Sequence, residues 1–272
     1  APSKGGRADF LNPSRVPTYR LVVEYDGSAF HGLQFQPSLR TVAGTLEDAL
    51  ARLFHEPAKI TAAGRTDAGV HATGQVVSFT AARDFPIERL ALVLNANTPA
   101  DLVVRDAAIV NDRFSARFDA RERVYDYLIF NRGFPSALWR ARAWHVPRPI
   151  DDARFLEAAE PLLGEHDFAT FCGDLPDRGG TVRELRAIEL ARRDDLVRVT
   201  VRGNAFLHRM VRVVVGTLVA CATGDRDAGF ARRALEACDR TAAGATAPAH
   251  GLYLAGVRYD DFDTYRPVGV AP

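Results

Sequence analysis

One segment of the sequence combines residue types and spacing that could do chemistry. It reads Gly64-Arg65-Thr66-Asp67-Ala68-Gly69-Val70-His71 and lies between two runs with β-strand composition. Its two glycines permit positive φ angles and close approach of another backbone. A loop held between strands can present the Asp67 carboxylate on a rigid scaffold. The alternative, equally open from this pattern, is that Asp67 only hydrogen-bonds the turn backbone.

A second segment places two tyrosines two residues apart. Arg123 to Phe130 has strand composition, so Tyr125 and Tyr127 share one face of that strand. An aromatic ring on a sheet face can stack on an unpaired base. The pattern alone favours the other reading, in which both tyrosines belong to the core.

A third segment, Ala205 to Thr223, has the apolar spacing of a long helix, with Asn204 as its expected N-cap. His208 and Arg212 are four residues apart and share a stripe beside the apolar face. An arginine on a packed helix is a candidate partner for a buried carboxylate, although a solvated charged face is commoner.

We expect the helices and strands around these three segments to form two α/β halves. The first half reads β-α-β-β-α-β, which is the ferredoxin-like order. We expect a basic leader over 1–17, an N-terminal half over 18–111 and a C-terminal half over 112–272. The expected elements of the first half are strands at 19–25, 60–63, 75–80 and 102–110 and helices at 42–55 and 87–94. Those of the second half are strands at 123–130, 142–146, 181–190, 197–201 and 251–257 and helices at 151–163, 205–223 and 228–238.

The amino-acid composition argues against several classes of protein. The 272 residues are 47% hydrophobic and 25% charged, which is ordinary for a folded protein. Three cysteines without C-x-x-C spacing argue against a disulfide framework or a zinc site, and they fit a cytoplasmic protein. The leader lacks the apolar core of a secretory signal. The longest apolar stretch, Val213 to Ala222, is too short to span a bilayer.

The net charge of +1 argues against a nucleic-acid partner, but the charge is unevenly distributed. Between residues 113 and 148 only three acidic residues oppose eight arginines, at positions 113, 117, 121, 123, 132, 140, 142 and 148. The first twenty residues carry four basic residues and one acidic residue. RNA binding needs a basic track rather than a basic protein, so this distribution is compatible with an RNA partner.

Taken together, these segments resemble the tRNA pseudouridine synthase A (TruA) family over about Tyr19 to Tyr259. The motif G-R-T-D-A-G-V-H resembles the family's catalytic motif. Supporting motifs are E-Y-D-G at 24–27, G-Q-V-V-S-F at 74–79, A-R-F at 116–118, R-V-Y-D-Y at 123–127, G-E-H-D-F at 164–168, T-V-R-E at 181–184, N-A-F-L-H-R-M-V-R at 204–212 and H-G-L-Y-L at 250–254.

The resemblance implies an isomerase that converts uridine to pseudouridine at positions 38 to 40 of the tRNA anticodon arm. It implies no metal and no organic cofactor. It implies a homodimer in which one tRNA touches both subunits. It also implies an α+β pseudouridine synthase fold, in which two ferredoxin-like halves share a mixed, mainly antiparallel central sheet with helices packed on it.

The resemblance also implies roles for individual residues. Asp67 corresponds to the catalytic aspartate, acting either as nucleophile or as base, and Arg212 to its basic partner. Tyr125 corresponds to the active-site tyrosine, which stacks beneath the uracil. Arg65 is expected to hold the nucleotide out of the helical stack. Further substrate-binding residues are expected within the same motifs: Thr66, His71, Arg123, Asn204 and His208.

Two segments depart from the family's pattern. Leu33-Gln34-Phe35-Gln36 lacks the usual tryptophan and basic residue, and Cys172-Gly173-Asp174 stands where a basic residue is common. These departures predict altered tRNA contacts rather than lost activity. One alternative function is a catalytically silent RNA-binding protein or tRNA chaperone on the same fold. A third hypothesis, a metal-free hydrolase using Asp67 and His71, lacks a nucleophile elbow or a second carboxylate motif.

Overall fold

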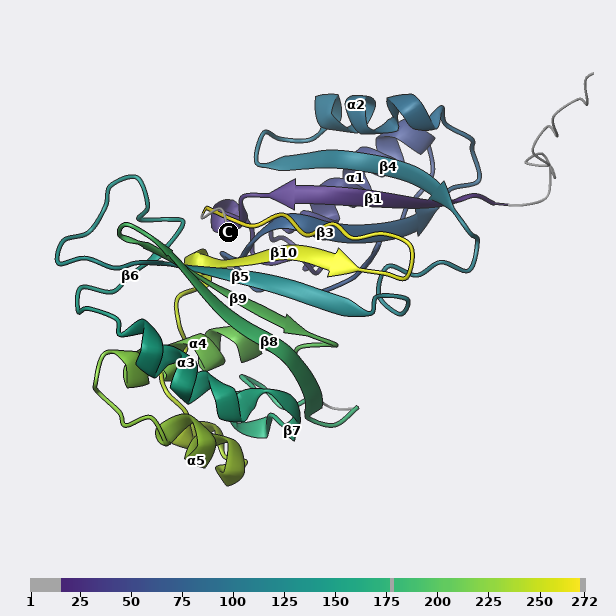
Figure 1. The fold of residues 1–272 in the computed structure, drawn as a ribbon. Coiled ribbons are helices and arrows are strands. Elements are labelled where there is room, and N and C mark those ends of the chain that lie inside the picture. The colour runs from purple at the N-terminus through teal and green to yellow at the C-terminus, as the bar shows by residue number, and fades with distance from the viewer. Residues whose placement is uncertain (1–15, 177–178, 270–272) are drawn as a thin grey trace, which may run out of the picture.

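The computed structural model describes residues 16–176 and 179–269, and Figure 1 shows its fold. The N-terminal half has the predicted β-α-β-β-α-β order. Its elements are β1 (Thr18–Tyr25), α1 (Val42–Phe54), β2 (Thr61–Ala62), β3 (His71–Thr80), α2 (Ile87–Asn97) and β4 (Leu102–Val110). The expected leader over 1–17 lies outside the described residues except for its last two positions.

The C-terminal half is longer and carries three α-helices within its described residues. Its elements are β5 (Glu122–Phe130), β6 (Trp144–His145), α3 (Asp152–Ala159), β7 (Gly164–Asp167), β8 (Val182–Arg193), β9 (Leu196–Gly203), α4 (Met210–Ala222), α5 (Phe230–Ala237) and β10 (Leu252–Arg258). Among the described residues no helix is long and apolar enough to cross a membrane. Cys172, Cys221 and Cys238 are all free thiols.

A single ten-stranded sheet runs through both halves in the order β4-β1-β3-β10-β5-β9-β8-β7, with β2 beside β3 and β6 beside β5. Only β10 with β3 and β6 with β5 pair in parallel among the described strands. The α+β class and the mixed, mainly antiparallel sheet are therefore confirmed. The last strand, β10, lies between β3 and β5, so the end of the chain joins the two halves (Figure 1).

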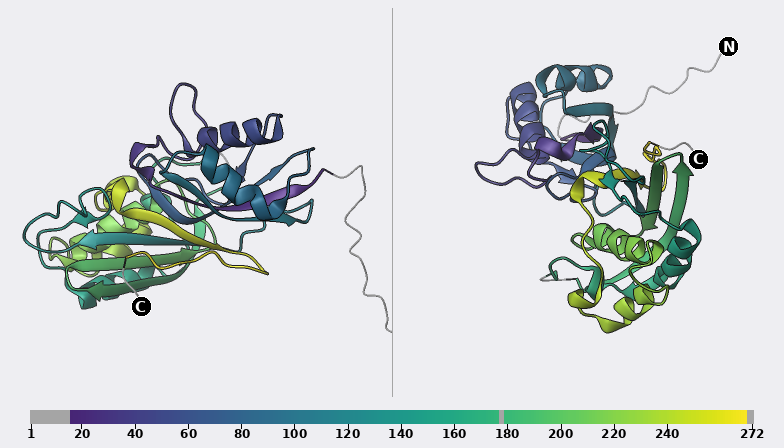
Figure 2. Two further views of the ribbon diagram at one scale, coloured as in Figure 1. Left: turned by 90° about the horizontal axis from the view of Figure 1, so that it is seen from above. Right: turned by 90° about the vertical axis from the view of Figure 1, so that its left-hand side faces the viewer.

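The helices form two separate groups on this sheet, as Figure 2 shows. In the first group, α1 begins at the cap Thr41, whose hydroxyl accepts from the Gly44 amide, and buries Leu46, Ala49 and Leu50. In the second group, α3 begins at the cap Asp151, whose carboxylate accepts two backbone amides.

The predicted start of the long helix is wrong. The helix α4 begins at Met210 instead of Ala205, and Asn204 does not cap it. The Asn204 side chain instead accepts from the amides of Glu184 and Ala205, which ties it to β8. Arg209, the residue before α4, has a φ of 58°, so the chain turns sharply before the helix begins. Pairing across β8 and β9 outweighs the local capping preference.

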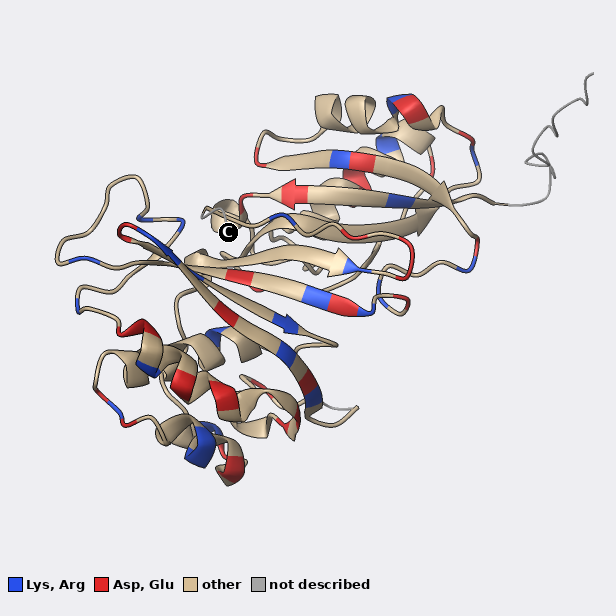
Figure 3. Cartoon of the chain, in the orientation of Figure 1, with Lys and Arg blue, Asp and Glu red and all other residues tan. Residues whose placement is uncertain are grey.

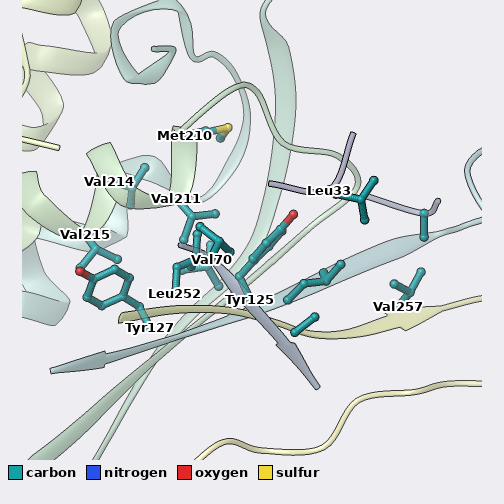
Figure 4. Close-up of a cluster of buried hydrophobic side chains, with 14 of the residues drawn as sticks. Leu33, Val70, Tyr125, Tyr127, Met210, Val211, Val214, Val215, Leu252 and Val257 are labelled. Atoms are coloured by element: carbon teal, nitrogen blue, oxygen red, sulfur yellow. The ribbon is translucent and has the colours of Figure 1, made fainter. Parts of the chain in front are cut away.

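One hydrophobic core joins the two halves around the motif at residues 64–71. Figure 4 shows Val70 from the motif beside Tyr125 of β5 and Val211 of α4. Tyr125 and Tyr127 are 6% and 0% exposed, so both lie in the core on the face that α4 covers. The loop 63–70 is thus anchored in packed side chains contributed by both halves.

Candidate active site

The loop 63–70 between β2 and β3 is pinned by buried hydrogen bonds. The fully buried Gln75 amide donates to the Gly64 carbonyl (2.7 Å) and accepts from the Gly64 amide (3.4 Å). The Thr66 carbonyl accepts from the Leu33 amide (3.0 Å), and the Thr66 hydroxyl bonds the Tyr25 hydroxyl (2.8 Å). Gly69 adopts a φ of 78°, the left-handed region that the sequence predicted for this turn.

Asp67 lies at the centre of this loop and pairs with Arg212 from the first turn of α4. Arg212 Nη1 donates to Asp67 Oδ2 at 2.9 Å, and Arg212 Nε donates to the Ala247 carbonyl at 2.8 Å. The two side chains are 25% and 15% exposed. The predicted partnership therefore exists in the structure. It joins residues 145 positions apart, one from each half.

Tyr125 lies below the same loop. A Cβ atom on Gly64 would lie only 3.3 Å from the Tyr125 hydroxyl, so the glycine lets the loop pass directly over the phenol. Phe206 contacts the Tyr125 ring edge-on, with 5.0 Å between centroids. Burial raises the pKa of Tyr125 far above its ordinary value, and nearby Tyr25 and Asp67 add to this, so the phenol is neutral near pH 7.

His208 lies on the other side of Asp67. Its Nε2 atom is 3.5 Å from Asp67 Oδ1, and its Nδ1 atom is 2.8 Å from a carboxylate oxygen of Asp174. The imidazole is about one third exposed. Asp67 therefore has a cationic partner on one oxygen and a histidine near the other.

Arg65 and Thr66 point in opposite directions from the loop. Arg65 is exposed and makes no hydrogen bond or ion pair with any other described residue. Its guanidinium is therefore available to a ligand. Thr66 is buried, and its hydroxyl is used by Tyr25.

Arg123 is used as a clamp inside the protein. Its guanidinium donates to four backbone carbonyls, those of Ala63, Arg117, Ala120 and Asn204. Burial lowers the pKa of Arg123. Through the Ala63 carbonyl, Arg123 holds the start of the loop 63–70 in place. Its guanidinium therefore bonds the protein's own backbone and is not directed at solvent.

His71 is likewise a buried clamp, with only 1% of its side chain exposed. Its Nδ1 accepts from the Gly27 amide (3.1 Å), and its Nε2 lies 3.2 Å from the His250 carbonyl. The ring stacks on Tyr253 at 4.7 Å. The Gly27 amide can only donate, so the ring that accepts its bond on Nδ1 is neutral; the same Nδ1 also lies 3.2 Å from Asp26 Oδ1. Burial lowers the pKa of His71, against the opposing effect of Asp26.

Asp67 and His71 do not share a helix, because His71 is the first residue of β3. In residues 16–176 and 179–269 no group of three or more His, Cys, Asp or Glu side chains could hold a metal ion.

Sequence reasoning missed two residues that build the site. Tyr25 lies within the E-Y-D-G motif, and burial raises its pKa to about 12, so its neutral hydroxyl serves Thr66. Asp174 reaches His208 from a loop more than one hundred residues from Asp67 along the chain. The motif could have indicated Tyr25, whereas the sequence singled out Asp174 only as part of a segment that departs from the family's pattern, with no link to His208.

The arginines between 113 and 148 do not form one continuous track. Some precede or begin β5 and others follow it, so they lie at opposite ends of that strand (Figure 3). Four of the eight pair with carboxylates; the pairs are Arg121–Asp260, Arg132–Asp195, Arg142–Asp26 and Arg148–Asp225. The local excess of positive charge is therefore smaller than the sequence count indicated.

The class of the protein follows from comparison with known families. The sequence profile of the family described as tRNA pseudouridine synthase matches residues 21–119 and 158–260. The first matched part contains Asp67, the second contains Arg212, and Tyr125 lies between the two. The chain therefore belongs to the tRNA pseudouridine synthase family and has its α+β fold.

Individual relatives show to which type of tRNA pseudouridine synthase the chain is similar. The chain is 44% identical to tRNA pseudouridine synthase A of a Caulobacter species, over 90% of this chain and 99% of the relative. It is 39% identical to tRNA pseudouridine synthase A of Bacillus licheniformis, over 89% of this chain and 99% of the relative. These relatives place it among the A-type enzymes, which are isomerases.

Among solved structures, a chain of a Cbf5-Nop10-Gar1 complex is similar over 74% of this chain and 53% of its own length. It has 11% identity and a TM-score of 0.32. The family assignment rests on the sequence matches.

Proposed function

We propose that this protein isomerises uridine to pseudouridine in the anticodon stem-loop of tRNA, at positions 38, 39 and 40, with Asp67 as the catalytic carboxylate. The observation that carries the proposal is the Asp67–Arg212 pair, with 2.9 Å between Oδ2 and Nη1, held at the junction of the two halves beside Tyr125. The family membership supplies the reaction class.

The reaction breaks the C1′–N1 bond, turns the uracil and forms a C1′–C5 bond, after which C5 loses its proton. Asp67 acts near C1′, either as the nucleophile or as the base that removes a ribose proton. Arg212 orients this carboxylate and places a positive charge beside it. A second hydrogen bond, from Arg212 Nε to the Ala247 carbonyl, holds the guanidinium in place while the substrate changes position.

Tyr125 supports the uracil from below. Its ring is held edge-on by Phe206, and its hydroxyl lies directly under the backbone of Gly64. A neutral phenol in this place can stack with the base and relay the C5 proton late in the reaction. Arg65 is free to hold the nucleotide outside the helical stack, a change that costs a few kcal/mol in unstacking.

The proposal also covers the oligomeric state of the protein, its contacts with tRNA and its compartment. We infer a homodimer whose two subunits contact one tRNA, working in the cytoplasm without metal or organic cofactor. The exposed arginines at both ends of β5 suit a large RNA that touches the protein at more than one place (Figure 3).

The test is incubation of the protein with an unmodified tRNA transcript, followed by mapping of pseudouridine at nucleotide resolution. We expect product at positions 38 to 40 of tRNAs that carry uridine there. Product only outside the anticodon arm would overturn the substrate assignment. Binding of the transcript with no pseudouridine at any position would favour the alternative, a catalytically silent RNA-binding protein.

A further inference from the structure

The two oxygens of the Asp67 carboxylate have different surroundings. Oδ2 accepts a 2.9 Å hydrogen bond from Arg212. Among the described residues, the polar side-chain atom recorded near Oδ1 is His208 Nε2, at 3.5 Å, which is longer than a strong hydrogen bond. Oδ1 is therefore the oxygen that can face a substrate, and His208 is the side chain beside it.

His208 is itself held by a second carboxylate. Its Nδ1 atom lies 2.8 Å from Asp174 Oδ2, much closer than Nε2 lies to Asp67. The Asp174 side chain is 79% exposed, and its carboxylate accepts the hydrogen bond from Nδ1. This contact orients the imidazole with Nε2 turned toward Asp67.

The backbone around Asp174 is shaped to fit His208. The Gly173 amide donates to the His208 carbonyl at 2.7 Å. A Cβ atom on Gly173 would lie 3.1 Å from His208 Nδ1 and 2.9 Å from Arg209 Cδ, so only glycine passes here without displacement. The Cys172 thiol donates to the Asp174 carbonyl at 2.9 Å and holds the segment in place. Three consecutive residues therefore contribute to the contact.

The chain on the α4 side is equally constrained. Arg209 follows His208 and adopts the left-handed region at a φ of 58°, which non-glycine residues seldom adopt. This turn presents His208 and Arg212 to the same carboxylate from the start of a single helix. Strained backbone that is retained next to a reactive group is a feature of functional sites.

We propose that His208 is a positioning residue for Asp67 and that Asp174 acts only through His208. A carboxylate restrained by Arg212 at one oxygen can still turn about its Cβ–Cγ bond. His208 beside Oδ1 limits that rotation, and Asp174 sets the place of His208. Small misplacements of a reacting group reduce the rate of the chemical step strongly. This inference rests on the proposed function and goes beyond it, since it assigns His208 to the enzyme's own carboxylate instead of to the RNA.

The test is a double-mutant cycle with His208→Ala, Asp174→Asn and the double variant. Two quantities are measured for each protein: the single-turnover rate constant at saturating tRNA and the Kd for tRNA. We expect His208→Ala to lower the rate constant about tenfold and Asp174→Asn to lower it several-fold. The double variant should be no slower than His208→Ala, because groups that act in series are not additive. The Kd should stay within about twofold of the wild-type value.

Matched controls come from residues of the same types outside the site. His166 bonds only the Leu163 carbonyl, and Asp227 pairs with Arg233 at the surface. His166→Ala and Asp227→Asn should therefore retain the full rate constant. His208→Gln keeps an amide that can bond both carboxylates, so it should be faster than His208→Ala. Circular dichroism of each variant checks that the fold is kept.

Several outcomes would overturn the inference. Wild-type rate constants in both single variants would show that Asp67 needs no such support. Multiplying losses in the double variant would show that Asp174 acts independently of His208. A raised Kd with an unchanged rate constant would assign His208 to RNA binding. Failure of the proposed function is distinguishable from all of these, since the wild-type protein itself would then form no pseudouridine.

Discussion

The loop 63–70 and the segment 131–148 both follow strands and both carry charge, yet they are held in opposite ways. The first is fixed by buried hydrogen bonds from Gln75 and Tyr25 and packs into the common core. The second packs Ala143 and Val146 into the core but keeps its arginines at the surface, in ion pairs with partly exposed partners such as Asp195.

The difference has a physical reason. A buried hydrogen bond that is broken leaves a polar group without water, so the geometry around it is strongly enforced. An exposed ion pair gains little and exchanges readily with solvent or with another anion. The rigid loop therefore suits a reacting carboxylate, and the surface segment suits arginines that must adapt to a phosphate backbone. Four substitutions test this contrast, from the largest expected effect to the smallest.

Replacing Asp67 with Asn should abolish pseudouridine formation, because an amide is neither a nucleophile nor a base at this position. The side chain keeps its size, so the loop should keep its shape and the Kd for tRNA should stay within about tenfold of the wild-type value. Single-turnover assays and a binding titration measure the two quantities. Full activity in this variant would remove Asp67 from the mechanism.

Replacing Arg212 with Gln should lower the single-turnover rate constant by about one hundredfold or more, because it removes the charge that opposes Asp67. Arg212→Lys is the matched control: it keeps the charge, loses the Nε hydrogen bond to the Ala247 carbonyl and should recover part of the rate. Equal rates for the Gln and Lys variants would mean that geometry matters and charge does not.

Replacing His71 with Asn should reduce stability without removing a reacting group. The loss of its bonds to Gly27 and His250 should cost about 1–3 kcal/mol in the free energy of unfolding. Urea denaturation measures this cost. An unchanged urea midpoint would show that the hydrogen bonds of His71 contribute nothing to the stability of the fold.

His71 should also make the stability of the folded protein depend on pH. Burial lowers the pKa of His71 in the folded protein, so the unfolded chain binds the extra proton first as the pH falls. Stability should therefore decrease as the pH drops below about 6.5, the ordinary pKa of histidine. Between about pH 7.5 and about pH 5.5 the His71→Asn protein should lose less stability than the wild type. A steeper loss in the variant would contradict the neutral state assigned to His71.

Replacing Arg140 with Gln should have the smallest effect. This exposed residue bonds only the nearby Ala137 carbonyl, so the thermal midpoint should not change. If the surface segment contacts phosphates, tRNA affinity should fall a few-fold and the slope of log K against log salt should decrease by about one. The rate constant at saturating tRNA should be unaffected. A lower rate constant there would place this segment within the catalytic framework.

The sequence predicted most elements of the fold, since apolar periodicity along a helix or strand is a local signal. It also predicted that Asp67 and Arg212 would meet, although only through a family resemblance. It misplaced the start of α4, because the bonds of Asn204 to β8 depend on strand pairing and not on neighbouring residues.

The sequence by itself determined the class of chemistry, because a motif specifies which functional groups are present. Tertiary structure decided which groups face a ligand and which hold the scaffold. Arg123 and His71 have the residue types of binding groups, yet burial commits their polar atoms to backbone partners. In the sequence, Asp174 is only part of a segment that departs from the family's pattern, and the fold brings it within 2.8 Å of His208. Such roles depend on distance in space, which the order of residues does not contain.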